Sequence, residues 1–252
     1  MAEVLFYERP VPLNRTVHKD LRMKGIPSMR FAARAHSVPL TGVEFPLAAR
    51  DVPILFAGER VEDAGPMALL GLRQEENLLV DAQGQWMPNV YVPAFVRRYP
   101  FILAEKPEGT EGEDFTVFLD EAFEGFGTEE GERLFNEDGS DSEILSRAVA
   151  FLGEFQQHVA RTRWFMDQLR KHDLLEPRNI RLEKQGKAIN LNGLFVVSEE
   201  RLRRLDAQTA QTFLAEGVLG WIYAHLLSLP NIDRLTRLLE AREEAEALAT
   251  RN

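Results

Sequence analysis

Residues 140–169 read SDSEILSRAVAFLGEFQQHVARTRWFMDQL, and here the spacing of apolar residues changes from short runs to a helical period. Ser140 and Glu143 fit a capping box, in which each side chain accepts a hydrogen bond from the other residue's backbone amide. The apolar residues that follow recur every three or four positions, namely Ile144, Ala148, Phe151, Leu152, Phe155, Val159, Trp164, Phe165 and Leu169. This pattern predicts a long helix with a break near Arg161-Thr162.

The residues before this stretch predict strands. Short apolar runs typical of buried strands lie at residues 51–58, 66–73, 77–81 and 115–120. Prolines stand at ten positions between residues 10 and 100, and each removes an amide donor and breaks a helix. The first 120 residues are therefore predicted to be β-rich.

The residues after it predict a hairpin and further helices. Two alternating runs within 179–197 flank Gln185-Gly186, which is typical of a hairpin turn with glycine at positive φ. Ser198 and Asp206 can each cap a helix, residues 213–229 predict a helix buried on most faces, and Ile232 begins the stripe of a last amphipathic helix. The sequence thus predicts one α+β domain over residues 1–252, with the helices of 140–250 packed on the β-rich half.

Composition excludes several classes of function. The chain has 252 residues, and 40 acidic against 30 basic residues give a net charge of −10, which argues against nucleic-acid partners and anionic membranes. The absence of cysteine excludes disulfides, thiol catalysis and thiolate metal sites. The N-terminus does not resemble a signal peptide, and the run at 213–229 is short for a membrane span, so we expect a cytoplasmic protein without a membrane span. Association with the cell surface stays open.

The negative charge is concentrated in one segment. Residues 105–143 hold fifteen acidic and two basic residues, whereas the rest of the chain is close to neutral. We expect residues 105–139 to form a solvated loop around a strand near Phe115, because charge blocks of this density are seldom buried. The alternative is a docking surface for a basic partner or a cation.

The motifs that would indicate a cofactor are missing or misplaced, and no cofactor is predicted. The glycines at 125–131 have the wrong spacing for a dinucleotide loop, and the surrounding glutamates would repel a pyrophosphate. The oxygen-rich run at 136–141 has its glycine in the wrong place for an EF-hand loop. The sequence contains neither a Gly-x-Ser-x-Gly elbow nor an HExxH pair.

The sequence contains one candidate metal site. His18-Lys-Asp20 has the His-x-Asp form found in facial iron triads, which require two histidines and one carboxylate. The second histidine could be any of the other four. The simpler interpretation is a hydrogen-bonded pair near the surface, since residues two apart share a face of any strand.

The stretch from Trp86 to Phe101 combines aromatic residues, prolines and two adjacent arginines. Such a combination can bind bases, sugars or peptides, and it can equally pack a core with guanidinium groups at its edge. The candidate binding residues are Trp86, Tyr91, Phe95, Arg97, Arg98 and Tyr99. We expect the core role to dominate, with the aromatic residues and Phe101 largely buried and one of the two arginines paired with a carboxylate.

The same stretch carries a family resemblance. Gly84-Gln-Trp86 followed by YVPAFVRRYPF at 91–101 resembles the SapC family of bacterial proteins, and further stretches agree in order from His18 to Leu239. They include HKDLR at 18–22, PLTGVEF at 39–45, LLGLRQEEN at 69–77 and NGLFVV at 192–197. The family is named after a gene at a surface-layer locus, and the resemblance implies an accessory role without established catalytic residues. A peptide permease shares the name, but its membrane helices have no counterpart here.

The sequence therefore leaves two alternative functions open. The first is a non-catalytic binding or accessory protein, with another protein or a peptide as its partner. The second is a metal-dependent enzyme that uses His18 and Asp20. The first is favoured because no motif requires catalysis.

Overall fold

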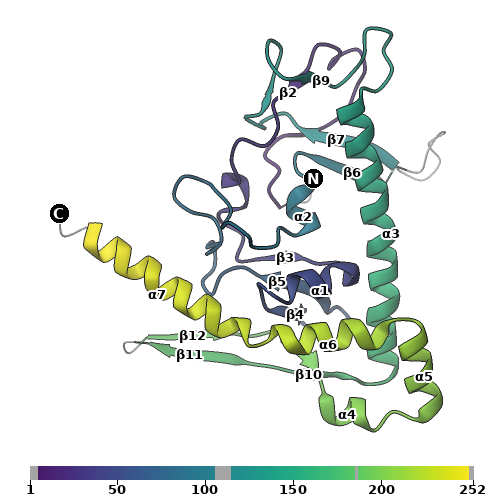
Figure 1. Cartoon of the computed structure of the whole chain (residues 1–252), viewed down its shortest axis with the longest axis vertical. Coiled ribbons are helices and arrows are strands. Elements are labelled where there is room, and N and C mark those ends of the chain that lie inside the picture. The colour runs from purple at the N-terminus through teal and green to yellow at the C-terminus, as the bar shows by residue number, and fades with distance from the viewer. Residues whose placement is uncertain (1–4, 106–114, 185–186, 250–252) are drawn as a thin grey trace.

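The computed structural model describes residues 5–105, 115–184 and 187–249. A helix of 29 residues, α3 (Glu143–Lys171), connects the parts of the fold. This helix runs along one side of the molecule from the upper strands to the central sheet (Figure 1). Ser142 begins the helix, and its side chain accepts a hydrogen bond from the Leu145 amide. Its buried residues recur on one face and contact both halves of the fold, namely Leu145, Leu152, Phe155, Thr162, Phe165, Met166 and Leu169.

The other elements are short. The strands are β1 (Pro10–Pro12), β2 (Arg22–Met23), β3 (Ser37–Pro39), β4 (Ile54–Ala57), β5 (Gly65–Leu69), β6 (Phe101–Glu105), β7 (Phe115–Asp120), β8 (Phe126–Gly127), β9 (Glu132–Arg133), β10 (Leu175–Pro177), β11 (Ile180–Lys184), β12 (Lys187–Leu191) and β13 (Leu194–Val197). The helices besides α3 are α1 (Phe45–Ala48), α2 (Ala94–Arg97), α4 (Glu199–Arg203), α5 (Ala207–Ala215), α6 (Val218–Ser228) and α7 (Asn231–Ala249), with 3₁₀ turns at Arg30–Ala32 and Gly42–Glu44.

The central layer is a five-stranded antiparallel sheet in the order β10-β13-β4-β5-β3. Strands β3 to β5 come from the first half of the chain, whereas β10 and β13 arrive after α3 and complete the sheet. The main core lies between this sheet, the C-terminal half of α3 and helices α1 and α6. The rings of Phe45, Phe56 and Phe165 meet there, and each side chain is fully buried, which contributes about 1.5–3 kcal/mol apiece.

A second layer of strands packs on the N-terminal half of α3. The sheets β1-β7-β6 and β8-β2-β9 lie at the upper end of the molecule in Figure 1. Phe101 and Leu119 from these strands pack against Leu145 and Leu152 of α3. One helix thus holds the two layers together, and the molecule is one compact α+β domain, as the sequence predicted.

The structure confirms several predicted elements. Strand β4 lies within 51–58, β5 overlaps the run at 66–73, β7 spans 115–120, and β11 and β12 form the predicted hairpin. The hairpin turn itself and residues 106–114 of the acidic segment lie outside the described residues. From 115 to 139 the acidic segment is loop apart from β7 and the two-residue strands β8 and β9.

Three local predictions are wrong. Ser140 does not cap α3, because its hydroxyl bonds to Asp138 and accepts from Asn136 within the preceding turn. The helix has no break near Thr162, whose hydroxyl donates to the carbonyl of His158 and so stays within the helix. Residues 77–81 form only an isolated bridge, Val80 to Trp86.

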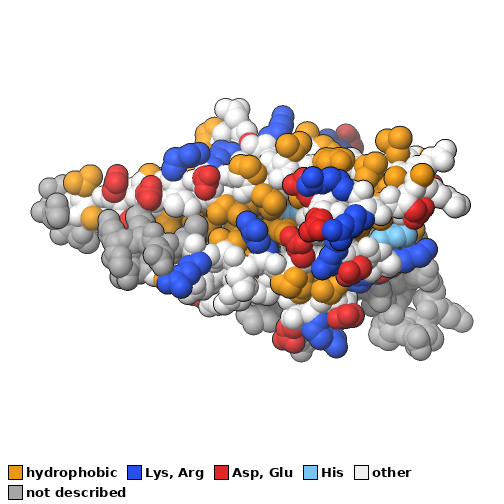
Figure 2. Space-filling model, turned by 90° about the horizontal axis from the view of Figure 1, so that it is seen from below, with side chains coloured by type: hydrophobic (Ala, Val, Ile, Leu, Met, Phe, Trp, Pro, Cys, Tyr) orange, Lys and Arg blue, Asp and Glu red, His pale blue; other side chains and the backbone are white. Residues whose placement is uncertain are grey.

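The apolar run at 213–229 is also not a single buried helix. Gly217 has a φ of 76°, a conformation that favours glycine, and it separates α5 from α6 at a bend of 85°. Leu214, Tyr223 and Leu227 are exposed to 70%, 53% and 75%. Figure 2 shows that hydrophobic side chains on the lower face of the molecule lie interspersed with charged ones.

Candidate functional site

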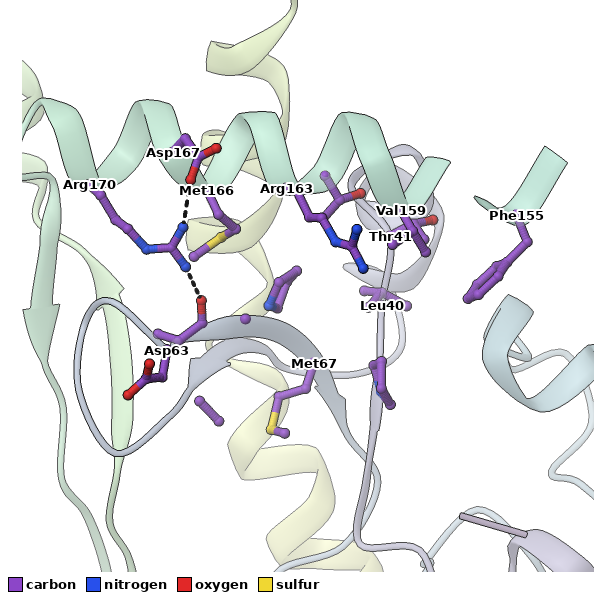
Figure 3. A pocket seen from close by; sticks show the side chains of 16 residues that line it. Leu40, Thr41, Asp63, Met67, Phe155, Val159, Arg163, Met166, Asp167 and Arg170 are labelled. Atoms are coloured by element: carbon purple, nitrogen blue, oxygen red, sulfur yellow. Dashed lines mark hydrogen bonds and ion pairs between the residues drawn. The ribbon is translucent and has the colours of Figure 1, made fainter. Parts of the chain in front are cut away.

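A cavity of about 530 Å³ opens between the C-terminal half of α3 and the β3–β5 side of the central sheet (Figure 3). We call it the α3 cavity. Its volume lies in the range of about 300–1,000 Å³ typical of ligand sites. Most of its lining is apolar, with Pro39, Leu40, Ala57, Ala64, Gly65, Pro66 and Met67 from the sheet side and Phe155, Val159 and Met166 from α3.

The period of α3 explains which residues reach the cavity. Phe155, Val159, Thr162, Met166 and Arg170 follow one another at three- and four-residue intervals, so they share one face of the helix. A hydrogen bond of 2.9 Å from the backbone amide of Gly42 to the Thr162 hydroxyl fastens this face to the turn after β3. The cavity wall is therefore positioned by regular structure and by a buried polar contact.

Three of the four charged residues that line the cavity, Asp63, Asp167 and Arg170, are held by contacts within the protein. Arg170 donates to the carbonyls of Val61 at 3.0 Å and Ala64 at 2.7 Å, and it forms an ion pair with Asp167 at 3.0 Å. On the opposite wall, Asp63 is paired with Arg60 at 2.9 Å. These contacts close the rim of the cavity and leave little free charge on those residues.

Arg163 differs from them. Its side chain is exposed and points from α3 into the cavity, as Figure 3 shows. No hydrogen bond or ion pair joins it to another residue in the part of the chain that the structure describes. An arginine that faces an apolar cavity without a partner offers five donors to a bound anion.

The hydroxyl groups at the cavity are engaged in the protein. Thr41 donates to the carboxylate of Glu44 at 2.8 Å, and Thr162 donates to the His158 carbonyl at 2.6 Å. The carboxylates of Asp63 and Asp167 are held in the ion pairs described above. The arrangement can hold a ligand, but it does not place a nucleophile beside a free base.

The stretch from Trp86 to Phe101 lies mainly in the core. Phe95, Tyr99 and Phe101 are 9%, 6% and 3% exposed, as predicted. Trp86 and Tyr91 are less buried, with intermediate exposure, and pack against the main core. Tyr99 stacks on Phe31 with a centroid distance of 4.0 Å.

The tyrosine hydroxyl groups of this stretch form hydrogen bonds within the protein. The Tyr99 hydroxyl donates to the buried carboxylate of Asp120 at 3.1 Å, and burial raises the pKa of Tyr99 well above its usual value. The Tyr91 hydroxyl donates to Glu44 at 2.9 Å, and burial, with Glu44 nearby, raises the pKa of Tyr91 to about 12. Both tyrosines are therefore neutral donors at physiological pH.

The two arginines of this stretch do not pair with carboxylates among the described residues, which corrects that prediction. The Arg98 guanidinium lies 3.8 Å from the Phe95 ring centroid and 5.4 Å from that of Phe155. Burial lowers the pKa of Arg98, and the neighbouring Tyr7 hydroxyl partly offsets this effect. Arg97 is exposed, and its guanidinium donates to the Val92 carbonyl at 3.0 Å. Aromatic faces and backbone carbonyls thus take the place of the expected carboxylates.

The structure gives the predicted metal site no support. His18 is 6% exposed, and its Nδ1 accepts from the Asn14 amide at 2.9 Å. Asp20 is exposed, and its carboxylate faces Lys19 and Arg133, each at 3.9 Å. In the described ranges, no group of three histidine, aspartate or glutamate side chains could hold a metal ion.

The sequence-based reasoning missed the α3 cavity. The helical period identifies the apolar residues of 140–169 and indicates nothing about Arg163, Asp167 and Arg170, which lie between them. A signal was present in the sequence, because Arg163 and Arg170 are seven residues apart, which is about two helical turns. Both lie beside the apolar stripe that includes Val159 and Met166. That signal does not reveal the cavity, which depends on how far the β3–β5 side stands from the helix.

The family model named SapC matches residues 13–235, which include the whole lining of the α3 cavity and the stretch from Trp86 to Phe101. The chain belongs to the SapC family. This SapC chain has no match among the curated proteins or the solved structures. The family membership covers both regions compared above and assigns a chemical role to neither.

No individual helix in the described part of this SapC protein is long and apolar enough to cross a membrane. Among the described residues, one bent pair, formed by residues 207–215 and 218–249, reaches that length and composition, and its two parts meet at 85°.

Proposed function

We propose that this SapC protein acts by binding, and that the α3 cavity receives an apolar group next to a negative charge on a partner protein or peptide. The observation that carries the proposal is Arg163, which faces an apolar cavity of about 530 Å³ without a partner among the described residues. Burial of an apolar group in the cavity would supply most of the affinity, and the guanidinium would select a carboxylate or a similar anion.

The state of the other polar groups favours binding over turnover. Thr41, Thr162, Asp63 and Asp167 are engaged in contacts within the protein. A bound group would therefore meet an apolar floor and Arg163, which has no partner among the described residues. General acid–base catalysis needs a group that is free to accept or release a proton near the reacting atom. The α3 cavity supplies an anion site instead.

Two fluorescent probes of similar shape test the proposal. Anilinonaphthalene sulfonate carries an anionic group, whereas N-phenylnaphthylamine is neutral, and both become fluorescent in apolar sites. We expect both to bind the wild-type protein, and Val159→Trp to weaken both because the indole fills the cavity. Arg163→Gln should weaken the sulfonate about tenfold, the effect of losing one charge-assisted contact, and leave the neutral probe unchanged.

Arg147→Gln is the matched control, because Arg147 is an exposed arginine on the same helix and, within the described ranges, forms an ion pair with Glu143 alone, at 3.7 Å. It should bind both probes as the wild type does. The proposal is contradicted if Val159→Trp leaves both affinities unchanged, since the probes would then bind elsewhere.

A further inference from the structure

The α3 cavity is bounded on two sides by hydrogen bonds that bridge α3 and the chain opposite it. On one side, the Gly42 amide donates to the Thr162 hydroxyl at 2.9 Å, so the turn after β3 is fastened to the helix. On the other side, Arg170 donates to the carbonyls of Val61 and Ala64 at 3.0 and 2.7 Å (Figure 3). A ligand chain therefore cannot run along α3 past these bridges and has to enter the cavity from the solvent.

The distance between the bridges limits what can enter. Thr162 and Arg170 are eight residues apart on α3, which corresponds to about 12 Å along the helix axis. An extended chain covers about 3.3 Å per residue, so about three or four residues span this distance. The recess thus has room for a short stretch of chain with one large side chain.

The charged residues fix the place of the anion within the recess. Arg163 follows Thr162 directly, and its guanidinium points into the cavity without a partner in the part of the chain that the structure describes. Beside Arg170 at the other bridge lie two acidic residues, Asp63 and Asp167, which also line the cavity. A ligand carboxylate placed there would face both of them, so the anion belongs beside Arg163.

The apolar lining fixes the place of the rest of the ligand. Met166 from α3 and Met67 from β5 reach into the space between the two bridges, and Ala64 and Pro66 complete the floor. An apolar side chain that lies on this floor has its carboxylate within one residue's length, because Arg163 and Met166 are neighbours on the helix surface. The anion and the apolar group of the ligand are therefore close together.

A chain terminus meets this requirement more simply than an internal segment. The last residue of a peptide carries its carboxylate and its side chain on the same Cα atom, and no chain continues beyond it. An internal acidic residue would need the chain to enter and leave the same short recess beside the two bridges. The ordering of these extra residues would cost free energy without adding a contact to Arg163.

We infer that the α3 cavity binds the C-terminal residue of a peptide or protein, with a large apolar side chain on the floor and the terminal carboxylate on Arg163. The inference rests on the proposed function and adds the chemical class of the partner. The bridges at Gly42 and Arg170 give the recess its limits, and Arg163 gives it its preference for a free carboxylate.

Peptides labelled with fluorescein at the N-terminus test the inference by fluorescence anisotropy. The reference peptide is Ser-Gly-Ser-Gly-Leu with a free carboxylate, and the second peptide is its C-terminal amide. The third is an amide with glutamate before the leucine, so that it has an acidic side chain and no terminal charge. The fourth ends in glycine with a free carboxylate.

We expect the reference peptide to bind about tenfold more tightly than either amide, because each amide lacks the carboxylate at the terminus. The peptide that ends in glycine should also bind at least about tenfold more weakly, because it buries no apolar side chain. Arg163→Gln should make the free acid and the amide bind equally. Arg147→Gln, the matched control, should retain the difference between them.

The outcomes separate the inference from the proposed function. If the amide with glutamate binds as tightly as the free acid, the ligand is an internal acidic segment, so the inference is wrong and the proposed function stands. The same holds if the acid and its amide bind equally, or do not bind, while the sulfonate probe still depends on Arg163. If neither the peptides nor the sulfonate probe depends on Arg163, both are wrong.

Discussion

The stretch from Trp86 to Phe101 and the flank of α3 from Val159 to Arg170 have similar ingredients, and the protein uses them differently. Both combine large apolar side chains with arginines. In the first, Arg98 lies against the rings of Phe95 and Phe155, and the tyrosine hydroxyls donate to Glu44 and Asp120. In the second, Arg163 faces a cavity without a partner among the described residues. Residue type therefore does not distinguish core from site; the number of internal partners does.

The largest expected effect tests the structural role of the first region. Phe95→Ala should lower the free energy of unfolding by about 3–5 kcal/mol, because it empties a buried aromatic site and removes the surface on which Arg98 lies. Urea unfolding followed by circular dichroism measures the change. Phe115→Ala is the control, since Phe115 is 37% exposed and should cost much less. A loss below that of the control would mean that Phe95 is not part of the core.

The next effect extends the comparison to a buried group in the central core. His225 accepts from the Val197 amide through Nε2 and bonds to the Ile54 carbonyl through Nδ1, and burial lowers its pKa to about 4. The unfolded chain, with a histidine pKa near 6.5, then binds the proton more tightly than the folded one. This contribution to stability is complete above about pH 6.5 and is lost as the pH falls toward 4, by on the order of 3 kcal/mol.

Urea unfolding at pH 7, 5 and 4 measures this dependence. His225→Gln should unfold more easily at pH 7 and lose less stability on acidification than the wild type. His172→Gln, which changes a partly exposed histidine, should follow the wild-type curve. Equal losses for the wild type and His225→Gln would show that His225 is not held neutral by burial.

A smaller effect is expected at Tyr99. Tyr99→Phe removes one donor from the Asp120 carboxylate, which still accepts from the amides of Glu8 at 3.0 Å and Arg9 at 2.8 Å. We expect a loss of about 1 kcal/mol in unfolding free energy and no change in probe binding. Tyr223→Phe, at an exposed position of α6, should change neither quantity. A loss of probe binding in Tyr99→Phe would move the site into the first region.

The sequence predicted the fold class and most of the elements, and its errors have local physical causes. The spacing of apolar residues identified α3 and the β11–β12 hairpin, because the periods of a helix and of a strand are visible from residues that are close together in the sequence. Ser140 and Ser142 are equally good caps by composition, and only the hydrogen bonds of the turn at 136–141 select Ser142. Gly217 stands within a continuous apolar run, so the bend between α5 and α6 was not visible from hydrophobicity.

The candidate site was harder to predict than the fold. The composition of the stretch from Trp86 to Phe101 pointed to aromatic residues that are mostly internal, although Tyr91 and Arg97 also line a smaller cavity of about 300 Å³. The α3 cavity combines residues of α3 with residues of β3 and β5 that lie more than 80 positions earlier in the chain. Whether an arginine there has a partner depends on the tertiary arrangement, which no local pattern encodes.

The most direct measurement compares Arg163→Gln with Arg98→Met in the same assay, as the ratio of the affinities for anilinonaphthalene sulfonate and N-phenylnaphthylamine. Arg98→Met replaces a buried cation with an apolar side chain of similar length, and such exchanges change stability little. We predict that the ratio falls about tenfold in Arg163→Gln and stays at the wild-type value in Arg98→Met. A ratio that falls in Arg98→Met and is unchanged in Arg163→Gln would contradict the assignment of the binding role to the α3 cavity.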